Sequence, residues 1–303
     1  MPKLYIVGDG AIGLLLAKHL SQQFAVTLVT RKAHSERYYY HDAGHTQPLE
    51  VATCQQESIA DNSIDLLLMP VKSYQAQEAF MQFLPKLSAN ANLIISHNGM
   101  LDWQSALAQL QGQQSAYFFS TAMAGYKTAH TVHHTGQGAS WFGPLNDAAT
   151  DNYQAVFSRL FSNLEHAEPC ADIMTKLWQK LAVNIAINPL TALAQVNNGQ
   201  LLQPQYSRQI LALLNEVQVV AASSGVNLPL ADILHLAYTV MAQTAANFSS
   251  MAQDVAKQRQ TEIDAMCGFI VAKARQQGNS APQNEALLQR VMKVSGELKG
   301  DTP

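Results

Sequence analysis

The sequence predicts two domains, a doubly wound α/β domain followed by an all-helical domain. Three observations support this prediction. Short apolar runs alternate with helical stretches through the first half, a glycine-rich turn follows the first apolar run, and the pattern from about Tyr153 onward is almost wholly helical. At about 100–200 residues per domain, the 303 residues suffice for two domains, which we place at 1–167 and 168–303.

Apolar runs in the first half predict the strands of a parallel sheet. Each run is apolar at successive positions rather than at alternate ones, so both faces of the sheet should be covered. Helical spacing predicts covering helices at 11–20 and 73–84, and the alternating, turn-rich stretch 128–141 predicts edge strands. The strands predicted from apolar runs are residues 4–7, 25–30, 49–53, 64–69, 93–95 and 116–120.

Long periodic segments in the second half predict helices. Pro189 should disturb the first of them directly after Asn188, because proline lacks an N–H group and clashes with the preceding turn. Glycine and proline residues separate the others. The predicted helices are 173–188, 209–224, 230–248 and 251–276, and the separating residues are Gly225, Pro229, Gly278 and Pro282.

The composition excludes several classes of protein. Charged residues make up 14% of the chain and the formal net charge is −3, which gives no electrostatic reason to expect nucleic acid or a membrane surface as a partner. Cys54, Cys170 and Cys267 are odd in number and widely spaced, which argues against a disulfide framework and favours a reducing compartment. Because no apolar stretch reaches the roughly 20 residues of a membrane span, we expect a cytoplasmic protein.

The glycine-rich turn has the pattern of a dinucleotide-binding loop. Gly8-Asp9-Gly10-Ala11-Ile12-Gly13 follows a predicted strand and opens a predicted helix, which is the context that this motif requires. The first glycine allows the tight turn, the second lets the backbone approach a pyrophosphate, and the third lets the helix pack closely on the strand. The helix N-terminus then supplies amide donors to the phosphates. A tight turn without a ligand is the alternative.

Two cations at the end of the second predicted strand indicate which cofactor binds. NAD-binding proteins usually have an acidic residue there, which accepts a hydrogen bond from the ribose 2′-hydroxyl. This chain has Thr30-Arg31-Lys32 instead. Arg31 and Lys32 suit a 2′-phosphate, so NADPH is favoured over NADH. A pair of solvated surface cations is the alternative.

Polar residues follow two further predicted strands. Lys72 comes shortly after the strand at 64–69, and Asn98 follows the strand at 93–95 in His97-Asn98-Gly99-Met100. Ligands of open α/β sheets bind at the carboxyl ends of the strands. An ordinary loop would explain either residue alone, but both together favour a functional site.

Three polar residues recur every fourth position within an otherwise apolar helix. Lys180, Asn184 and Asn188 form one stripe that drifts by about 40° per step. A solvated face would usually carry more polar neighbours, and asparagine is a poor helix former. The stripe therefore favours a buried site over a solvated face.

Several other polar residues leave their interpretation open. Ser249 or Ser250 could cap a helix or bind a ligand, and Glu262 could be a surface carboxylate or a site residue. The histidines, among them the pair His41 and His45, lack the carboxylate or cysteine partners expected of a zinc site. We therefore expect no metal.

The chain resembles the ketopantoate reductase family across essentially its full length. The blocks 97–100 and 180–189 are specific to that family, whereas the glycine motif is shared by many others. The resemblance implies a Rossmann domain joined to a helical domain of the 6-phosphogluconate dehydrogenase type. It also implies reduction of 2-dehydropantoate by NADPH to pantoate, a step towards pantothenate and coenzyme A. The matching segments are 8–13, 71–72, 97–100, 178–193, 249–254 and 261–264.

The same resemblance implies roles for single residues. Lys180 matches the family's general acid, which protonates the carbonyl oxygen as hydride reaches the carbon. Glu262 matches the acidic residue that contacts the substrate and helps to keep Lys180 charged. The remaining matches are Asn184, Asn188 and Ser250 for substrate hydrogen bonds, Asn98 for cofactor and substrate, Lys72 for the cofactor and Arg31 for the 2′-phosphate.

Some questions stay open at the level of sequence. The loop at 120–124 does not match the family, and the partner of the substrate carboxylate is either backbone amides or Ser250. An NADPH-dependent reductase of another small 2-keto acid or of an imine is one alternative function, and a non-catalytic NADPH-binding sensor is another. The sequence does not distinguish a monomer from a homodimer.

Overall fold

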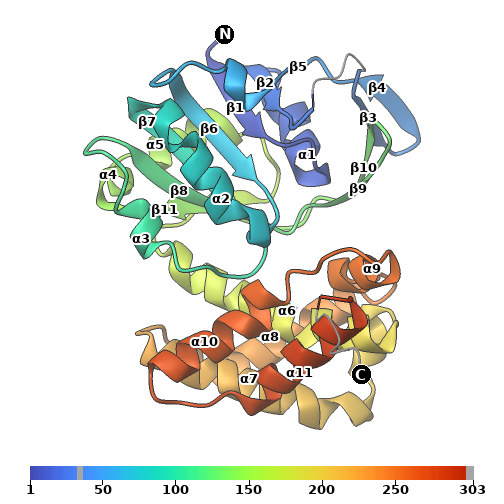
Figure 1. The fold of residues 1–303 in the computed structure, drawn as a ribbon. Coiled ribbons are helices and arrows are strands. Elements are labelled where there is room, and N and C mark those ends of the chain that lie inside the picture. The colour runs from blue at the N-terminus through green and yellow to red at the C-terminus, as the bar shows by residue number, and fades with distance from the viewer. Residues whose placement is uncertain (33–36, 298–303) are drawn as a thin grey trace, which may run out of the picture. The chain divides into compact units, whose positions relative to one another are not determined.

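The computed structural model describes residues 1–32 and 37–297 (Figure 1). The chain divides into two compact units. The first comprises Met1–His97 and Asp102–Ile173, and the second comprises Asn98–Leu101 and the chain from Met174 onward. Among the described residues, no helix is long and apolar enough to cross a membrane.

A mostly parallel sheet forms the centre of the first unit. In the described residues its order is β12-β11-β8-β7-β6-β1-β2-β5. Neighbouring strands from β5 to β8 are parallel, whereas β11 is antiparallel to β8 and parallel to β12. The strands are β1 (Lys3–Val7), β2 (Ala25–Val29), β5 (Ala52–Cys54), β6 (Ile64–Pro70), β7 (Leu87–Ser96), β8 (Ser115–Thr121), β11 (Ser140–Pro144) and β12 (Ala167–Pro169).

Helices cover both faces of this sheet, as the continuous apolar runs predicted. On one face, Phe119 of β8 stacks on Phe161 of α5 with ring centroids 4.3 Å apart, and α1 joins the same core. On the other face, Phe118 contacts His97 and Phe80 of α2 contacts Trp103. Successive strand residues point to opposite faces, so both must be buried. The helices of this unit are α1 (Ala11–Leu20), η1 (Gln56–Ser58), α2 (Ser73–Phe83), η2 (Leu84–Lys86), α3 (Gln104–Leu107), α4 (Asp147–Thr150) and α5 (Tyr153–Phe161).

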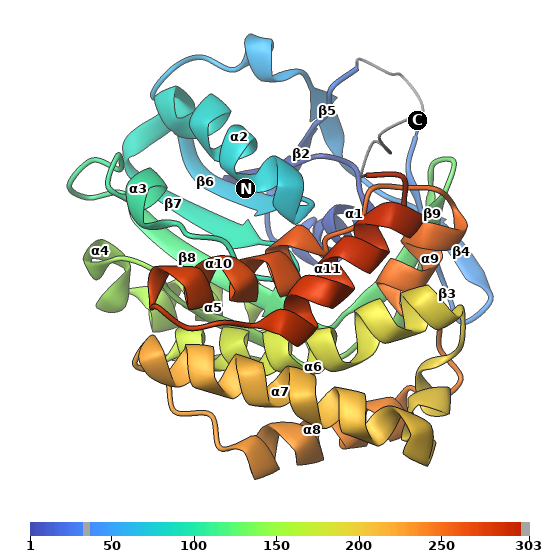
Figure 2. The ribbon, with the colours of Figure 1, turned by 60° about the horizontal axis from the view of Figure 1, so that its bottom comes forward.

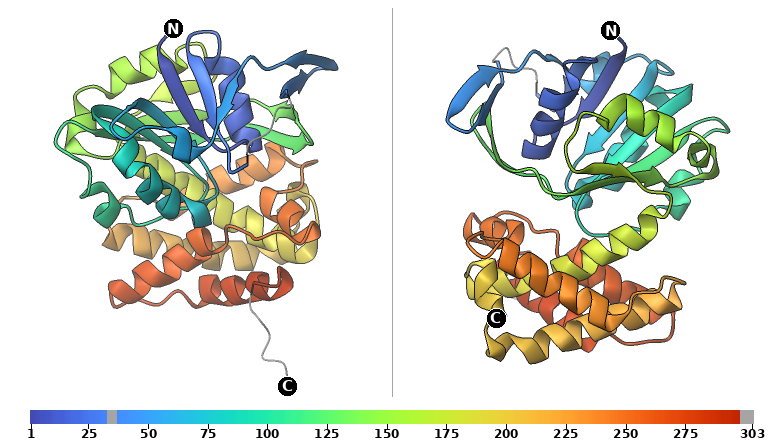
Figure 3. Two further views of the ribbon diagram at one scale, coloured as in Figure 1. Left: turned by 45° about the horizontal axis from the view of Figure 1, so that its top comes forward. Right: turned by 180° about the vertical axis from the view of Figure 1, so that it is seen from behind.

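A second, smaller sheet lies beside α1 (Figure 3). Its order in the described chain is β4-β3-β10-β9, and its strands are β3 (Tyr39–Asp42), β4 (His45–Pro48), β9 (Ala124–Thr128) and β10 (Thr131–Gly136). The expectation of strands at 128–141 was therefore right, but their expected place at an edge was wrong. β11 lies inside the main sheet, between β8 and β12. β10 lies inside the second sheet, between β9 and β3, and β3 is distant from it in the sequence. Local alternation predicts a strand but not its partner.

The second unit is helical, and α7 lies beside α8, α10 and α11 (Figure 2). β12 still pairs with β11, so the sheet extends slightly past the expected domain boundary at residue 167. The elements are α6 (Ile173–Ala194), η3 (Asn198–Leu202), α7 (Pro204–Ser223), α8 (Leu230–Gln243), α9 (Ser250–Ala256), the π-helical turn η4 (Asp264–Gly268), α10 (Phe269–Gln276) and α11 (Pro282–Val294).

Pro189 does not end α6, contrary to the expectation from the sequence. The helix continues to Ala194, and Leu190 and Ala192 beyond the proline are buried. Thr191 donates a hydrogen bond from Oγ1 to the carbonyl of Ile187 at 2.8 Å. The burial of this last turn outweighs the backbone hydrogen bond that the proline removes.

The segment 251–276 is not one helix either, and α8 ends before the predicted residue 248. The break falls between α9 and η4, where the backbone N–H and the hydroxyl of Thr261 donate to Glu297 Oε1 at 2.9 and 2.8 Å. Glu297 is 36 positions away in the sequence. A local periodicity therefore could not reveal this interruption.

The N-terminus of α11 is capped from a neighbouring helix. Its N-cap residue, Ala281, has no side chain that accepts a hydrogen bond. Glu216 of α7 accepts instead from the backbone N–H groups of Gln283 and Asn284, at 2.8 and 2.9 Å, and from the side chain of Asn284 at 2.8 Å. One carboxylate thus satisfies two amides that the helix leaves unpaired.

We expect Glu216→Ala to lower the free energy of unfolding by about 1–3 kcal/mol, because it leaves these donors without an acceptor. The matched control is Glu285→Ala on α11, which removes an exposed ion pair with Arg275 and should cost less than about 1 kcal/mol. Urea denaturation of both variants measures the difference. Equal losses would show that Glu216 contributes no more than a surface charge.

Candidate active site

The glycine loop adopts the turn that the motif predicts. Gly8 follows β1 with φ of +83°, and its N–H donates to the carbonyl of Val29 at 2.8 Å. Such a φ favours glycine. Gly10 is the N-cap of α1 and has no side chain to bond to the first turn of the helix. The amides of Ala11, Ile12 and Gly13 therefore begin a helix whose N-terminus suits a phosphate.

Asp9 is the charged member of this loop, and residues from outside the motif bind it. Tyr38 donates its hydroxyl to Oδ2 of Asp9 at 2.9 Å, and Lys127 donates from Nζ to the same oxygen and to the backbone carbonyl of Asp9. Burial alone would raise the pKa of Asp9, but the hydrogen bonds from Lys127 and Tyr38 lower it below the usual value. Lys127 and Tyr38 belong to no recognisable motif, so the sequence alone did not identify them as part of this loop's surroundings.

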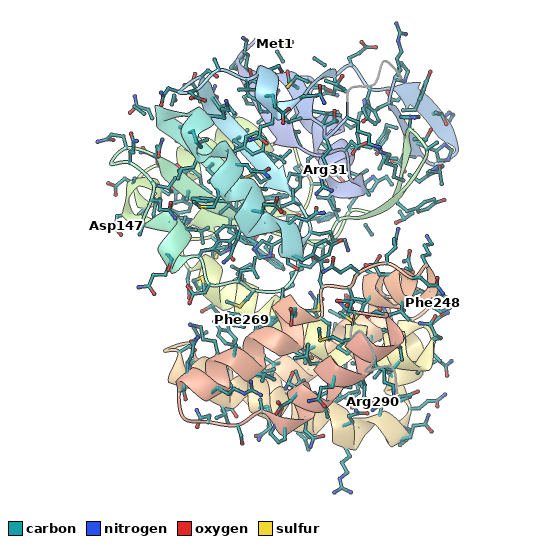
Figure 4. All side chains as sticks on the ribbon, viewed as in Figure 1. Met1, Arg31, Asp147, Phe248, Phe269 and Arg290 are labelled. Atoms are coloured by element: carbon teal, nitrogen blue, oxygen red, sulfur yellow. The ribbon has the colours of Figure 1, made fainter. Side chains whose placement is uncertain are left out.

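The other residues predicted to bind the cofactor follow adjacent strands. Arg31 lies just beyond β2 with an exposed side chain (Figure 4), and its carbonyl accepts from Gln55 Nε2 at 3.3 Å. Lys72 is the N-cap residue of α2, just beyond β6. Because β6, β1 and β2 are adjacent and parallel, Lys72, the glycine loop and Arg31 lie along one edge of the sheet. This edge has the arrangement expected of a nucleotide site.

The His97–Met100 block serves two packing functions. His97 is buried and its Nε2 accepts a hydrogen bond from Trp103 Nε1 at 3.2 Å. Gly99 has φ of +72°, and a Cβ at this position would lie 2.3 Å from the carbonyl oxygen of Ala265. Met100 N–H donates to that same oxygen at 2.7 Å. Only glycine allows this close approach, which holds the segment Asn98–Leu101 on η4 of the helical unit.

This packing brings Asn98 to Glu262. Asn98 donates from Nδ2 to Oε2 of Glu262 at 3.1 Å. Glu262 is only 4% exposed, although it carries a carboxylate. It lies in the break between α9 and η4, next to the anchored Thr261. Buried carboxylates require hydrogen-bonding or charged partners, so the surface interpretation of Glu262 does not hold.

Lys180 of α6 experiences the charge of this carboxylate. Burial lowers the pKa of Lys180 to about 8, and the charge of Glu262 opposes that change. An ammonium group with such a pKa is still mostly protonated at neutral pH but gives up its proton readily. Lys180, Glu262 and Asn98 thus form one cluster in the helical unit.

The polar stripe of α6 continues from this cluster. Lys180 and Asn184 are partly exposed, whereas the residues between them, 181–183, are buried. Asn188 is buried, and its Nδ2 contacts Met266 Sδ of η4 at 3.8 Å. The structure therefore places Lys180 and Asn184 on a partly exposed face of α6, and Asn188 against η4.

Ser249, rather than Ser250, caps α9. Ser249 Oγ accepts from the N–H of Ala252 at 3.0 Å and from the hydroxyl of Thr191 at 2.7 Å, which ties α9 to α6. Ser250 is exposed on the first turn of the helix. The capping role that the sequence left open thus belongs to Ser249, and Ser250 stays a candidate for substrate binding.

His41, His45, His133 and His134 lie in strands of the second sheet. Tyr40 bonds His134 Nδ1 at 3.0 Å, and the rings of His41 and His133 pack with centroids 4.9 Å apart. Within residues 1–32 and 37–297, no three His, Cys, Asp or Glu side chains are grouped so that they could hold a metal ion.

Comparison with known proteins gives concordant results for both units. The family profile described as "Ketopantoate reductase PanE/ApbA" matches residues 4–147, and the profile described as "Ketopantoate reductase PanE/ApbA C terminal" matches residues 172–295. The chain is 34% identical to the 2-dehydropantoate 2-reductase of Vibrio cholerae over 291 residues, which cover 95% of this chain and 96% of that relative.

Solved structures agree with the fold. A PanE/ApbA family ketopantoate reductase from Ralstonia eutropha JMP134 superposes with a TM-score of 0.85 at 24% identity, covering 98% of this chain and 99% of the other. D-mandelate dehydrogenase with NADH and anilino(oxo)acetate has a TM-score of 0.88 at 20% identity, with the same coverage. The predicted fold class, a Rossmann sheet followed by a helical domain, is confirmed.

Proposed function

The chain belongs to the ketopantoate reductase family, and we propose that it reduces 2-dehydropantoate to pantoate with NADPH in pantothenate biosynthesis. The family makes it an oxidoreductase that uses a nicotinamide cofactor. The observation that carries the proposal is the cluster of Lys180, Glu262 and Asn98, which pairs a buried carboxylate with an amine of lowered pKa. The three free cysteines are compatible with a cytoplasmic location.

Reduction of a ketone requires a hydride at the carbonyl carbon and a proton at its oxygen. The bound nicotinamide would supply the hydride. Lys180 would polarise the carbonyl through its ammonium group and then donate the proton, to be reprotonated from solvent. Its pKa of about 8 suits a donor that must be charged before the reaction and neutral after it.

Glu262 has two proposed roles. Its negative charge favours the protonated form of Lys180, and its carboxylate can accept a hydrogen bond from the hydroxyl group of the substrate. The hydrogen bond from Asn98 fixes the orientation of the carboxylate. Asn184, Asn188 and Ser250 would then provide further hydrogen bonds to the substrate.

The cofactor residues fit NADPH. Gly8–Gly13 with the N-terminus of α1 would bind the pyrophosphate, as the backbone at Gly8 and the uncapped first turn favour. Arg31, exposed beyond β2, would bind the 2′-phosphate, and Lys72 would contact the cofactor from beyond β6.

The function is tested by following NADPH oxidation at 340 nm with 2-dehydropantoate and a panel of other 2-keto acids and cyclic imines. We expect turnover that strongly favours 2-dehydropantoate. Turnover restricted to another acid or to an imine would keep the mechanism and replace the substrate. NADPH binding without turnover on any compound would support a sensor in place of an enzyme.

We expect Lys180→Ala to lower kcat by about 10²–10⁴-fold, the range for loss of a general acid. In the wild type, kcat should fall as the pH rises through about 8, because the donor loses its proton, and this descending limb should disappear in the variant. Steady-state kinetics from pH 6 to 10 measure both effects. Lys293→Ala, an exposed position of α11, is the control. An unchanged kcat for Lys180→Ala would refute the assignment.

We expect Arg31→Ala to weaken NADPH binding by about tenfold or more while NADH binding changes little, because only NADPH carries the 2′-phosphate that Arg31 is proposed to bind. Fluorescence titration with the two cofactors measures the ratio of their dissociation constants, and NADH serves as the internal control. Equal losses for both cofactors would show that Arg31 does not discriminate between them.

A further inference from the structure

The glycine loop contains a charge that should oppose its proposed ligand. Asp9 occupies the second position of the motif, next to the backbone that would approach a pyrophosphate. A carboxylate close to two phosphates repels them, and the repulsion is only partly screened by solvent. The loop therefore needs a compensating charge if it is to bind a dinucleotide tightly.

The structure supplies that charge from the second sheet. Lys127 of β9 donates from Nζ to the Asp9 carboxylate and, at 3.1 Å, to the Asp9 backbone carbonyl, so its ammonium group holds the loop at two oxygens. The hydroxyl of Tyr38 donates to the same carboxylate oxygen at 2.9 Å. The ammonium group also lies 5.3 Å from the centroid of the Tyr38 ring, a cation–π arrangement.

Burial distinguishes this ion pair from an ordinary surface pair. The side chain of Lys127 is 25% exposed and that of Asp9 is 39% exposed, so solvent only partly screens them. Isolated exposed pairs contribute little, but here two side chains make three hydrogen bonds to one residue of the loop. The second sheet packs on α1, the helix that the loop opens, which places β9 beside the loop.

We propose that Lys127, supported by Tyr38, is a positioning residue for the cofactor. It neutralises Asp9 and holds the glycine loop in the form that accepts the pyrophosphate. The inference rests on the proposed function, since it assumes that this loop binds a nicotinamide dinucleotide. The second sheet then has a role in cofactor binding, because Lys127 of β9 carries the positive charge that neutralises Asp9 in a loop distant in the sequence.

The mechanism predicts a specific pattern among variants. Lys127→Met leaves Asp9 uncompensated and should weaken the binding of NADPH and NADH alike by about tenfold, because both carry the pyrophosphate. The loss should appear in the KM for the cofactor rather than in kcat. Adding Asp9→Asn to Lys127→Met removes the uncompensated charge, so the double variant should bind NADPH within about threefold of the wild type.

The experiment is a fluorescence titration of NADPH and NADH with the wild type, Lys127→Met, Asp9→Asn and the double variant. The control is Lys86→Met, which removes another Lys–Asp pair, with Asp61 at 2.7 Å, next to the amino end of β6 and hence at the opposite edge of the sheet. It should leave both dissociation constants unchanged. Thermal unfolding of each variant verifies that it is folded.

Tyr38→Phe provides a test if Lys127→Met does not fold. It removes only the hydroxyl donor and should weaken NADPH binding by roughly twofold to threefold, an effect that Asp9→Asn should cancel.

Three outcomes would overturn the inference. Wild-type affinity in Lys127→Met would show that the pair is irrelevant to binding. A double variant as weak as Lys127→Met would show that Lys127 contacts the cofactor directly. A wild type that binds neither cofactor would refute the proposed function itself, and the inference with it.

Discussion

The buried carboxylate of Glu262 is the constraint on which the helical unit's candidate site depends. A charge that is 4% exposed must be compensated by hydrogen bonds or by an opposite charge. Asn98 donates to it directly, and Lys180 provides the opposite charge. The chain accommodates this arrangement by interrupting the helix between α9 and η4 and by packing Gly99 against Ala265, where a larger residue would clash.

Two opposing effects set the proton affinity of Lys180. Burial disfavours the ammonium form, whereas the Glu262 carboxylate favours it, and burial has the larger effect. The result is an amine whose pKa of about 8 lies close to physiological pH. Without the carboxylate, the same burial would lower the pKa of the amine further. The proton affinity of Lys180 on α6 therefore depends on Glu262, which lies in the break before η4.

The nucleotide loop follows the same physical rule with a more exposed pair. Hydrogen bonds from Lys127 and Tyr38 favour the ionised form of Asp9. Lys127 belongs to β9 of the second sheet, and Tyr38 directly precedes β3 of the same sheet. In both units, a charged residue in a motif is compensated by a residue outside it. A motif therefore identifies the location of a site but not all the residues that control it.

The sequence by itself determined the parallel sheet, the covering helices, the glycine loop and the polar stripe of α6, because each depends on local spacing of apolar, glycine or polar residues. Family resemblance added Glu262, for which the local pattern left a surface carboxylate and a site residue both open. Only the tertiary structure decided which strands pair and which side chains bond to one another. The pairing of β3 with β10, the break at Thr261 and the bonds of Asp9 join residues that are far apart in the chain. The continuation of α6 through Pro189 also depends on burial by distant residues. Such contacts leave no periodic signal in the sequence, because the residues that make them come together only when the chain is folded.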